Sequence, residues 1–183
     1  STAGLAVEEA VSKIRGEKGT PVRLTLSRAS KNEGKEFELS VIRDTIALPT
    51  AEYELRADGV FVIQLYMFNA QAPRMFADAL EKFQYSGSNK LIIDLRGNPG
   101  GFLEAAVDMA SWFIPSGSIV VTQDYAGQED EVYRSSGFGT QFPGTKVVVL
   151  LNGGSASASE IFAGALHDHN RATLIGQQSF GKG

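Results

Sequence analysis

The sequence predicts a mixed α/β fold, and two occurrences of one local pattern carry this prediction. Residues 90–95, which are apolar except for Lys90 and Asp94, and residues 147–151, which are all apolar, lack polar alternation, as expected for strands buried inside a sheet. After each run comes a glycine-bearing turn, followed by apolar residues spaced as on one face of a helix, from Phe102 and from Ala158 onward. This order places the start of each helix at the carboxyl edge of a sheet, where unpaired N–H groups favour negative charge.

Composition limits what the chain can be. Its 183 residues are enough for one sizeable domain and a fragment of another. A net charge of −4 gives no electrostatic reason to expect nucleic acid as a partner. No apolar run reaches the roughly 18–20 residues of a transmembrane helix, and the absence of cysteine excludes disulfide bonds. Because the sequence begins with Ser1 and not with methionine, we expect an excised or processed fragment.

Residues 1–46 predict a helix followed by two strands. A helical stripe of apolar residues comes first and ends near Gly16; it consists of Leu5, Val7, Ala10, Val11 and Ile14. Residues 22–26 and 37–41 then alternate between apolar and polar, and the charged segment 31–35 has the glycine of a hairpin turn. This arrangement resembles the carboxyl-terminal half of a PDZ domain, in which the helix forms one wall of a groove that accepts a peptide as an added strand.

The next segments predict the start of a second domain. Residues 47–59 are polar, contain a proline and an Asp-Gly pair, and indicate a connector at a domain boundary. Residues 59–68 predict a strand whose last three side chains line the core or a cleft wall. A helix follows, with apolar positions Met75, Phe76, Leu80 and Phe83. Further along, residues 102–114 predict a helix, and 119–133 a hairpin with an acidic turn.

The loop of residues 97–101, Gly-Asn-Pro-Gly-Gly, lies between the strand at 90–95 and its helix. Its spacing fits neither Gly-x-Gly-x-x-Gly nor the Gly-Lys-Ser/Thr ending of a P-loop, so nucleotide binding is disfavoured. A backbone N–H of Gly100 or Gly101 could instead hold a peptide carbonyl oxygen, with the N–H of Ala158 as second donor. Asp94 and Arg96, just before the loop, have the pattern of a structural pair.

Three serines, Ser155, Ser157 and Ser159, lie at the turn after the strand at 147–151. One interpretation is structural, because Ser157 and Glu160 match a helix capping box. The other makes one serine a nucleophile, whose oxyanion the N–H groups at the start of the helix would stabilise. The pattern alone does not choose among the three serines.

A nucleophilic serine needs a base, and the candidates are few. The only histidines are His167 and His169. On a continuous helix His167 would lie about 15 Å from Ser157, too far for a hydrogen bond. The spacing of the two histidines also disfavours a metal site, since residues two apart do not share a helical face. A lysine or a carboxylate remains, and a parallel strand at 172–176 could return Lys182 to the edge of the sheet that carries Ser157.

At this point the chain resembles a known family, the carboxy-terminal processing peptidases, also called tail-specific proteases. The resemblance is carried by NGGSASASEIFAGAL, by LIGQQSFGKG and by the strand and loop IIDLRGNPGG. It implies that Ser157 is the nucleophile and Lys182 its base. It also implies an oxyanion hole formed by the glycine loop, at Gly100 or Gly101, together with Ala158.

The resemblance further implies an architecture and an activity. Residues 47–183 would form a ClpP- and crotonase-like protease core, truncated at its carboxyl-terminal end, and residues 1–46 a partial PDZ domain. The expected activity is that of a serine endopeptidase that cleaves proteins or peptides near accessible C-terminal tails. No metal or other cofactor is expected. The expected location is extracytoplasmic, such as a bacterial periplasm, a cell envelope or a chloroplast lumen.

Two alternatives stay open. The first is a catalytically inactive peptide-binding or scaffolding relative, because the family's lysine is assisted by a glutamine soon after it and this sequence ends at Gly183. For the same reason we expect this truncated chain to be weakly active or inactive. The second is an acyl-thioester enzyme that uses the oxyanion hole without a nucleophile.

Overall fold

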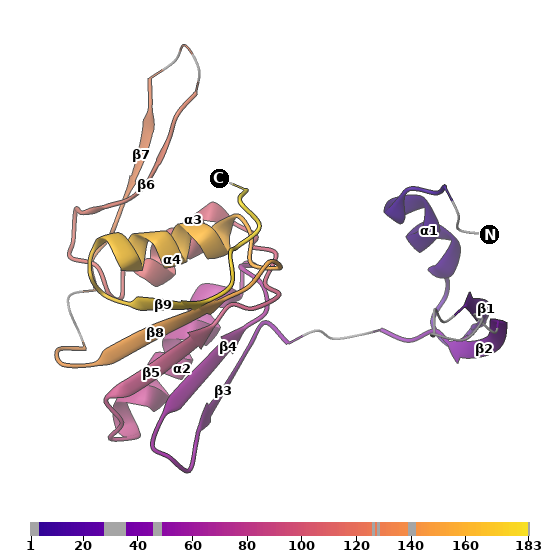
Figure 1. Cartoon of the computed structure of the whole chain (residues 1–183), viewed down its shortest axis with the longest axis horizontal. Coiled ribbons are helices and arrows are strands. Elements are labelled where there is room, and N and C mark those ends of the chain that lie inside the picture. Colours follow the sequence, from indigo (N-terminus) through magenta and orange to yellow (C-terminus); the bar gives the residue numbers. More distant parts are fainter. Residues whose placement is uncertain are drawn as a thin grey trace. The chain divides into compact units, whose positions relative to one another are not determined.

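The computed structural model describes residues 4–27, 36–45, 49–125, 127, 129–138 and 142–182. Contacts divide the chain into two units, residues 1–48 and 49–183 (Figure 1). Each unit is described by itself. The hairpin turn predicted at 31–35 lies outside the described residues.

The first unit contains helix α1 (Val7–Ile14) and the strands β1 (Pro21–Ser27) and β2 (Glu36–Ile42). The strands pair antiparallel, with Pro21 opposite Ile42. Arg43 joins helix to strands, because its Nε donates to the Ile14 carbonyl at 2.8 Å and its Nη1 to Thr20 Oγ1 at 2.9 Å. The predicted helix and two strands are therefore confirmed, and the assignment of this unit to a PDZ domain remains a prediction.

The second unit is built on a five-stranded sheet with the order β3-β4-β5-β8-β9 (Figure 1). Its strands are β3 (Ala51–Leu55), β4 (Phe61–Leu65), β5 (Lys90–Asp94), β8 (Lys146–Leu151) and β9 (Thr173–Gly176). Strand β3 runs antiparallel to β4, and the other neighbours are parallel. Parallel strands that alternate with helices along the chain confirm the predicted mixed α/β class.

Strand β3 corrects the prediction of a connector at 47–59. Residues 51–55 read Ala-Glu-Tyr-Glu-Leu and pair with β4 over their whole length. Only Ala51 is buried, because β3 is an edge strand and the side chains after Ala51 are exposed. An edge strand needs few apolar residues, so its composition resembles that of a polar linker.

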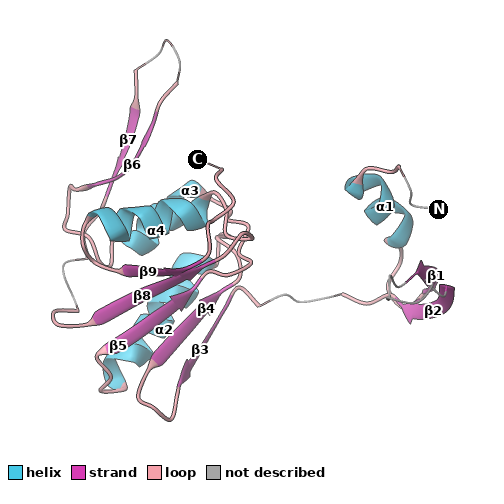
Figure 2. Cartoon of the chain, in the orientation of Figure 1, coloured by secondary structure: helices cyan, strands magenta, loops and turns pink. Residues whose placement is uncertain are grey.

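Three helices cover one face of the sheet (Figure 2). They are α2 (Ala72–Tyr85), α3 (Leu103–Ala110) and α4 (Ala158–Asp168). Side chains in register on neighbouring strands, Ile63, Ile93 and Val149, are fully buried under these helices. On the other face Ile92 and Val148 are only half-buried. The prediction that the strand at 147–151 is buried on both faces therefore holds for one face only.

An aromatic cluster fixes α4 in place. Phe162, from the second turn of α4, packs against Phe68, Phe76 and Phe113 with ring centroids 5.9–6.4 Å apart. All four rings are fully buried. Burying an aromatic side chain of this size contributes roughly 1.5–3 kcal/mol, so the beginning of α4 is held against the core of the unit.

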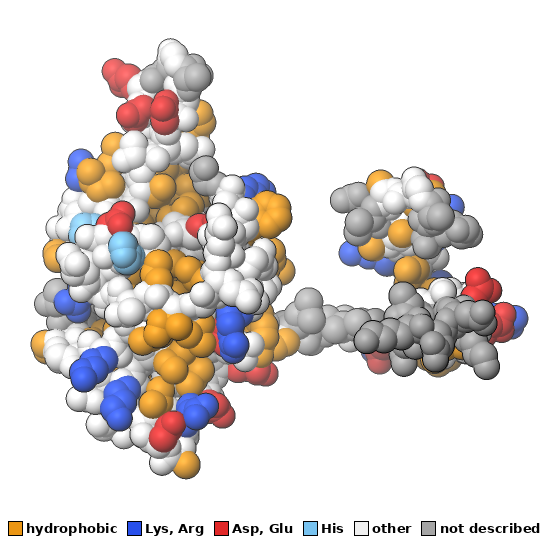
Figure 3. All heavy atoms as spheres, in the orientation of Figure 1, with side chains coloured by type: hydrophobic (Ala, Val, Ile, Leu, Met, Phe, Trp, Pro, Cys, Tyr) orange, Lys and Arg blue, Asp and Glu red, His pale blue; other side chains and the backbone are white. Residues whose placement is uncertain are grey.

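A hairpin of strands β6 (Ile119–Gln123) and β7 (Glu131–Arg134) extends away from the helices (Figure 1). It confirms the hairpin predicted at 119–133. Figure 3 shows its acidic side chains gathered toward the far end. The predicted helix at 102–114 is regular only as α3. After it the N–H groups of Trp112 and Phe113 bind carbonyls three residues earlier, those of Met109 and Ala110, and the chain continues in turns toward Pro115.

Candidate active site

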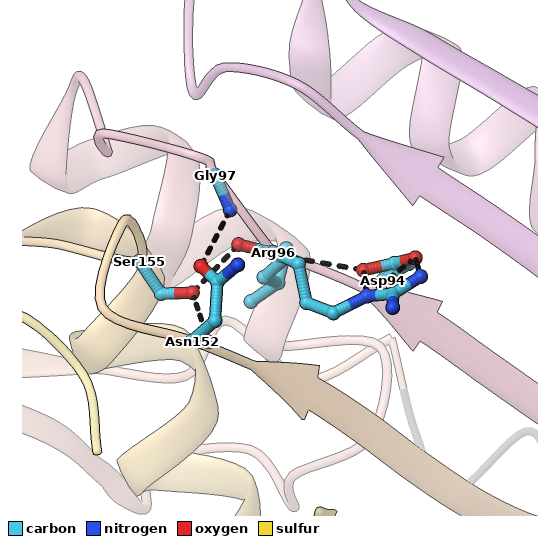
Figure 4. Close-up of polar contacts among 6 residues, drawn as sticks. Asp94, Arg96, Gly97, Asn152 and Ser155 are labelled. Carbon is cyan, nitrogen blue, oxygen red and sulfur yellow. Dashed lines mark hydrogen bonds and ion pairs between the residues drawn. The ribbon is translucent and has the colours of Figure 1, made fainter. Parts of the chain in front are cut away.

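Two loops meet at the carboxyl ends of the neighbouring parallel strands β5 and β8. Gly97 N–H donates to Asn152 Oδ1 at 2.9 Å (Figure 4), and Ala156 N–H donates to the Asn98 carbonyl at 3.0 Å. Both bonds join residues more than fifty positions apart. These two bonds hold the loop that precedes α4, and with it the start of α4, beside the glycine loop of residues 97–101.

Two of the three serines are used to hold these loops together. The Ser155 hydroxyl donates to the Leu95 carbonyl at 2.8 Å and accepts the Asn152 N–H at 3.0 Å (Figure 4). The Ser159 hydroxyl donates to the Asn98 carbonyl at 3.0 Å. Both side chains are fully buried. Their hydroxyls are therefore structural groups and have no access to a substrate.

Ser157 differs from both neighbours. It is only partly buried, and its hydroxyl donates no hydrogen bond within the described part of the chain. Its backbone has φ 54° and ψ −116°, a left-handed conformation that only one other non-glycine residue, Asn170, shares in φ among the described residues. Such a conformation costs of order 1–3 kcal/mol and is concentrated at functional sites. A strained serine between a strand and a helix is the local geometry that exposes a nucleophile at the top of a sheet.

The glycine loop lies directly against Ser157. A Cβ added to Gly100 would lie 2.9 Å from the Ala158 nitrogen and 2.9 Å from the Ser157 Cβ, so only glycine allows this approach. Gly100 N–H donates to Asn98 Oδ1 at 2.9 Å, and Asn98 Nδ2 donates to the Leu65 carbonyl at 2.9 Å. The fully buried Asn98 side chain thus fixes the shape of the loop.

The two glycines of the loop present different N–H groups. The N–H of Gly100 is already bound by Asn98, and Gly100 is buried. Gly101 is exposed, and within residues 49–125 and 142–182 neither its N–H nor that of Ala158 donates a hydrogen bond to the protein. Two backbone N–H groups therefore remain without a protein acceptor among these residues: that of Ala158, directly after Ser157, and that of Gly101, next to the Gly100 that approaches Ser157.

Glu160 connects α4 with the segment that carries Lys182. Ser157 and Glu160 form the predicted capping box, in which Glu160 Oε2 accepts the Ser157 N–H at 2.8 Å. The same oxygen accepts the Lys182 N–H at 2.9 Å, and Oε1 accepts the Gly181 N–H and the Ser179 hydroxyl, both at 2.7 Å. One carboxylate thus receives four hydrogen bonds.

Electrostatics at Glu160 follow from these contacts. Burial by itself raises the pKa of the Glu160 carboxyl. The hydrogen bonds from the Ser179 hydroxyl and from the three N–H groups outweigh burial, so the pKa lies below the ordinary value of a glutamate. Glu160 is therefore an anion at neutral pH, in the first turn of a helix, where the dipole favours negative charge.

Lys182 reaches this region as expected from a parallel strand. After β9 the chain crosses β8, with Gln177 N–H donating to the Leu151 carbonyl at 3.1 Å and Phe180 N–H to the Ser155 carbonyl at 2.9 Å. The structure thus brings the backbones of Lys182 and Ser157 to one carboxylate. The Lys182 side chain is exposed, and within residues 142–182 its amine makes no hydrogen bond to the Ser157 hydroxyl.

Asp94 and Arg96 are engaged with each other. Arg96 Nε and Nη2 bind Asp94 Oδ1 and Oδ2 at 2.9 and 2.6 Å, and the Arg96 N–H binds Oδ1 at 3.0 Å (Figure 4). Asp94 is buried, and burial alone raises the pKa of its carboxyl. The hydrogen bonds from the Arg96 side chain and N–H lower this pKa by more than burial raises it, so the net shift is downward. The pair braces the end of β5 before the glycine loop.

The histidines lie at the other end of α4. His167 Nδ1 is 3.1 Å from Asp168 Oδ1, and His169 Nε2 is 2.8 Å from the Ile119 carbonyl oxygen. His167 is exposed, and neither ring contacts Ser157, as the helix length predicts. Across the described ranges, no group of three or more His, Asp or Glu side chains could hold a metal ion.

Sequence reasoning assigned Glu160 a single role, as a helix cap. Its contacts with Gly181 and Lys182 were missed, because they join residues 21 and 22 positions apart through backbone N–H groups, which leave no mark on composition. One signal in the sequence could have indicated these contacts. Glu160 lies at the start of a helix, and the Gly181-Lys182 pair is expected at the same edge of the sheet, where its N–H groups can reach an acidic side chain.

Comparison with known proteins gives a consistent result. Peptidase family S41 matches residues 59–183. The carboxy-terminal processing protease CtpA of Bacillus subtilis (strain 168) is 39% identical over 184 residues, covering 100% of this chain and 38% of the relative. The carboxyl-terminal-processing protease of Synechocystis sp. (strain ATCC 27184 / PCC 6803 / Kazusa) is 39% identical over 186 residues, covering 100% and 42%.

Among solved structures, the photosystem II D1 C-terminal processing protease superposes with a TM-score of 0.76 at 26% identity, covering 98% of this chain and 49% of that one. This chain thus spans less than half the length of each of these relatives. Within the part that the structure describes, every helix is too short or too polar to cross a membrane. The resemblance to carboxy-terminal processing peptidases and the α/β protease fold that it implied are both confirmed, and the chain belongs to peptidase family S41.

Proposed function

We propose that the protein containing this chain is a serine endopeptidase that cleaves proteins or peptides near their carboxyl termini with a Ser157–Lys182 dyad. One observation carries the proposal: the strained, partly exposed Ser157 lies against Gly100 of the glycine loop and shares a carboxylate with the Lys182 backbone. The names of the B. subtilis and Synechocystis relatives describe processing at carboxyl termini, which supports the substrate class.

The catalytic cycle would begin with attack by Ser157 Oγ on the scissile carbonyl carbon. Its proton passes to the uncharged Lys182 amine, and a tetrahedral oxyanion forms. When the C–N bond breaks, the Lys182 ammonium returns that proton to the leaving amine, and an acyl ester remains on Ser157. Water then attacks the ester, again with Lys182 accepting a proton, and releases the new carboxyl terminus. No metal or organic cofactor enters any step.

For the oxyanion hole we propose the N–H groups of Gly101 and Ala158. The alternative donor, Gly100, is disfavoured because its N–H is already bound to the buried Asn98 side chain. Gly101 is exposed, and its N–H binds no acceptor within residues 49–125 and 142–182. A peptide carbonyl beside Ser157 would then receive one donor from the loop and one from the positive end of the α4 dipole.

The remaining proposals concern the whole protein. Residues 1–46 would belong to a PDZ domain that presents carboxyl-terminal tails to the protease core of residues 47–183. We place the protein outside the cytoplasm, in a bacterial periplasm, a cell envelope or a chloroplast lumen, as the family resemblance implies. Fractionation of cells that express the tagged protein tests this location directly.

A serine-directed fluorophosphonate tests the nucleophile. Peptide mapping by mass spectrometry should find the label on Ser157, and Ser157→Ala should abolish labelling. Ser136→Ala is the matched control, because Ser136 is also an exposed serine of this unit and its loss should change nothing. Label on any serine other than Ser157 would contradict the assignment.

One observation favours a second candidate, a peptide-binding relative without catalysis. The Lys182 amine is exposed and is not bonded to the Ser157 hydroxyl within the described residues. If a longer protein with residues after Gly183 binds carboxyl-terminal peptides but neither cleaves them nor reacts with the phosphonate, this candidate replaces the dyad. An acyl-thioester enzyme would instead turn over its substrate after Ser157→Ala.

A further inference from the structure

We propose that Glu160 is a positioning residue for catalysis, which sets the separation of Ser157 and Lys182 by binding the backbone of both with one carboxylate. The inference rests on the proposed dyad. It assigns to Glu160 a role that neither helix capping nor proton transfer includes. Glu160 touches no reacting atom, so it acts only through the residues that it holds.

The contacts that carry the proposal converge on two oxygens. Oε2 is shared between the Ser157 N–H at 2.8 Å and the Lys182 N–H at 2.9 Å. Oε1 is shared between the Gly181 N–H and the Ser179 hydroxyl, both at 2.7 Å. Hydrogen bonds to an ionised acceptor are shorter and about twice as strong as those between neutral groups. The two backbones are therefore joined through a single atom.

The base of this connection is rigid. Glu160 lies in the first turn of α4, and Phe162, two residues later, is fully buried in the aromatic cluster. Ser157 directly precedes the same helix. The nucleophile and the carboxylate are thus fixed to one element, and what remains to be positioned is the segment that carries Lys182.

That segment has few other anchors near its end. Before Lys182, Gln177 and Phe180 donate their N–H groups to β8 and to the turn after it. The Phe180 side chain is 67% exposed, so it does not pack the segment down. Within the described residues, the backbone N–H groups of Gly181 and Lys182 bind Glu160 alone. Glu160 is the last fixed point before the lysine.

The chemistry of a carboxylate explains why a neutral isostere cannot replace it. Each carboxylate oxygen accepts two of the four hydrogen bonds, whereas an amide has one acceptor oxygen and an NH₂ group that only donates. In Glu160→Gln the NH₂ group can donate to the Ser179 hydroxyl but cannot accept from a backbone N–H, so at least one of the four bonds is lost, and the remaining ones go to a neutral acceptor, which binds more weakly. The side chain keeps its size, and α4 keeps its core contacts.

The first test is structural and needs no activity. Amide hydrogen exchange of the 183-residue chain should show protection at Ser157, Gly181 and Lys182. In Glu160→Gln the exchange of Gly181 and Lys182 should rise at least tenfold, while the β5 and β8 amides keep their protection. Glu104→Gln is the matched control, since Glu104 is an exposed glutamate in the first turn of α3 and makes none of these contacts. Unchanged exchange at Gly181 and Lys182 in Glu160→Gln would overturn the proposal.

The second test asks whether positioning matters for the reaction, in a longer, active protein. A misplacement of about 1 Å can cost about 100-fold in rate, so Glu160→Gln should lower kcat about 100-fold with KM nearly unchanged. Normal kcat together with released Gly181 and Lys182 amides would also refute the role. Should Glu160→Gln not fold, Glu160→Asp preserves the negative charge in the first turn of α4 but is one methylene too short to reach Lys182, and it should show the same two effects.

The design separates this inference from the dyad. If Lys182→Ala retains full turnover, the dyad is wrong, whatever Glu160 does. If Lys182→Ala is inactive but Glu160→Gln has normal kcat, the dyad stands and the positioning role falls. Ser157→Ala should leave the exchange of Gly181 and Lys182 unchanged, because the bond from residue 157 to Glu160 is made by the backbone.

Discussion

The Asn98 side chain accepts the N–H of Gly100 at 2.9 Å, in a site where Asn98 has no exposed surface. This bond occupies the N–H of Gly100. Gly101 is exposed, and its N–H binds no acceptor within residues 49–125 and 142–182. The shape of the candidate oxyanion hole thus depends on a buried amide that no substrate would touch.

Replacing Asn98 by alanine should therefore lower both stability and activity. The Leu65 carbonyl and the Gly100 N–H would lose their partners, at a cost of roughly 1–3 kcal/mol for each buried group. Urea denaturation should show a lower unfolding free energy, and peptide hydrolysis by a longer, active protein should show a lower kcat. Asn89→Ala, at an exposed position, is the control. An Asn98→Ala protein of normal stability would contradict the role of this amide.

Replacement by alanine should affect mainly the stability of the fold at Ser155 and mainly peptide hydrolysis at Ser157. Ser155→Ala leaves the Leu95 carbonyl and the Asn152 N–H without their buried partner and should cost roughly 1–3 kcal/mol of unfolding free energy. Ser157→Ala removes the capping hydroxyl of α4 and should cost about 0.5–2 kcal/mol of unfolding free energy, but it should also abolish hydrolysis. The unfolding free energy and the rate of peptide hydrolysis should be measured for both variants. A Ser155→Ala protein that is fully stable but inactive would count against Ser157 as the nucleophile.

The backbone strain at Ser157 gives a prediction that does not involve catalysis. Glycine adopts positive φ without a Cβ penalty, whereas alanine retains it. Ser157→Gly should therefore be more stable than Ser157→Ala by about 1 kcal/mol, despite the usual entropic cost of glycine. Equal melting temperatures for the two variants would mean that φ 54° carries no strain.

Lys182 as the base predicts a specific failure of arginine. An ammonium or a guanidinium cannot accept a proton, and guanidinium does not deprotonate in proteins. In a longer, active protein, Lys182→Arg and Lys182→Ala should both fall to the activity of Ser157→Ala. Appreciable hydrolysis by the arginine variant would show that a positive charge is enough and would end the dyad hypothesis.

The buried Asp94 predicts a dependence of stability on pH. Its folded-state pKa is below the ordinary value of an aspartate, because the hydrogen bonds from Arg96 outweigh the upward effect of burial. The ionised pair therefore stabilises the fold above the ordinary pKa, and this contribution is lost as the pH falls through the lowered one. The difference in unfolding free energy between the wild type and Asp94→Asn should be largest near neutral pH and shrink in acid. Asp108→Asn, an exposed site on α3, should show no such trend.

Much of the fold follows from local patterns in the sequence. The buried strands, the stripes of α2 and α4 and the hairpin of β6 and β7 were predicted because burial on a sheet or a helix face imposes a period on apolar residues. Strand β3 was not predicted, because the exposed Glu52 and Glu54 of this edge strand give it the polar composition of a linker. The resemblance, more than periodicity, indicated Ser157 and Lys182.

The finer features of the site could not be predicted, for one physical reason. They depend on hydrogen bonds between residues distant in sequence, such as Ser155 to Leu95 and Ser159 to Asn98, which are 60 and 61 positions apart. These two bonds distinguish the structural hydroxyls of Ser155 and Ser159 from the hydroxyl of Ser157. In the same way, the bond from Gly100 to the Asn98 side chain distinguishes the Gly100 N–H from that of Gly101. Neither distinction exists within the loop sequences alone.

The dependence of the Gly181–Lys182 backbone on Glu160 has a thermal consequence. A segment whose N–H groups are held by one carboxylate can detach in a local opening whose free energy is only a fraction of that for unfolding the whole unit. On heating, the lysine would then leave the serine while the sheet and the aromatic cluster of Phe162 remain intact. Inactivation would precede the calorimetric transition, and cooling would restore turnover without any refolding of the core.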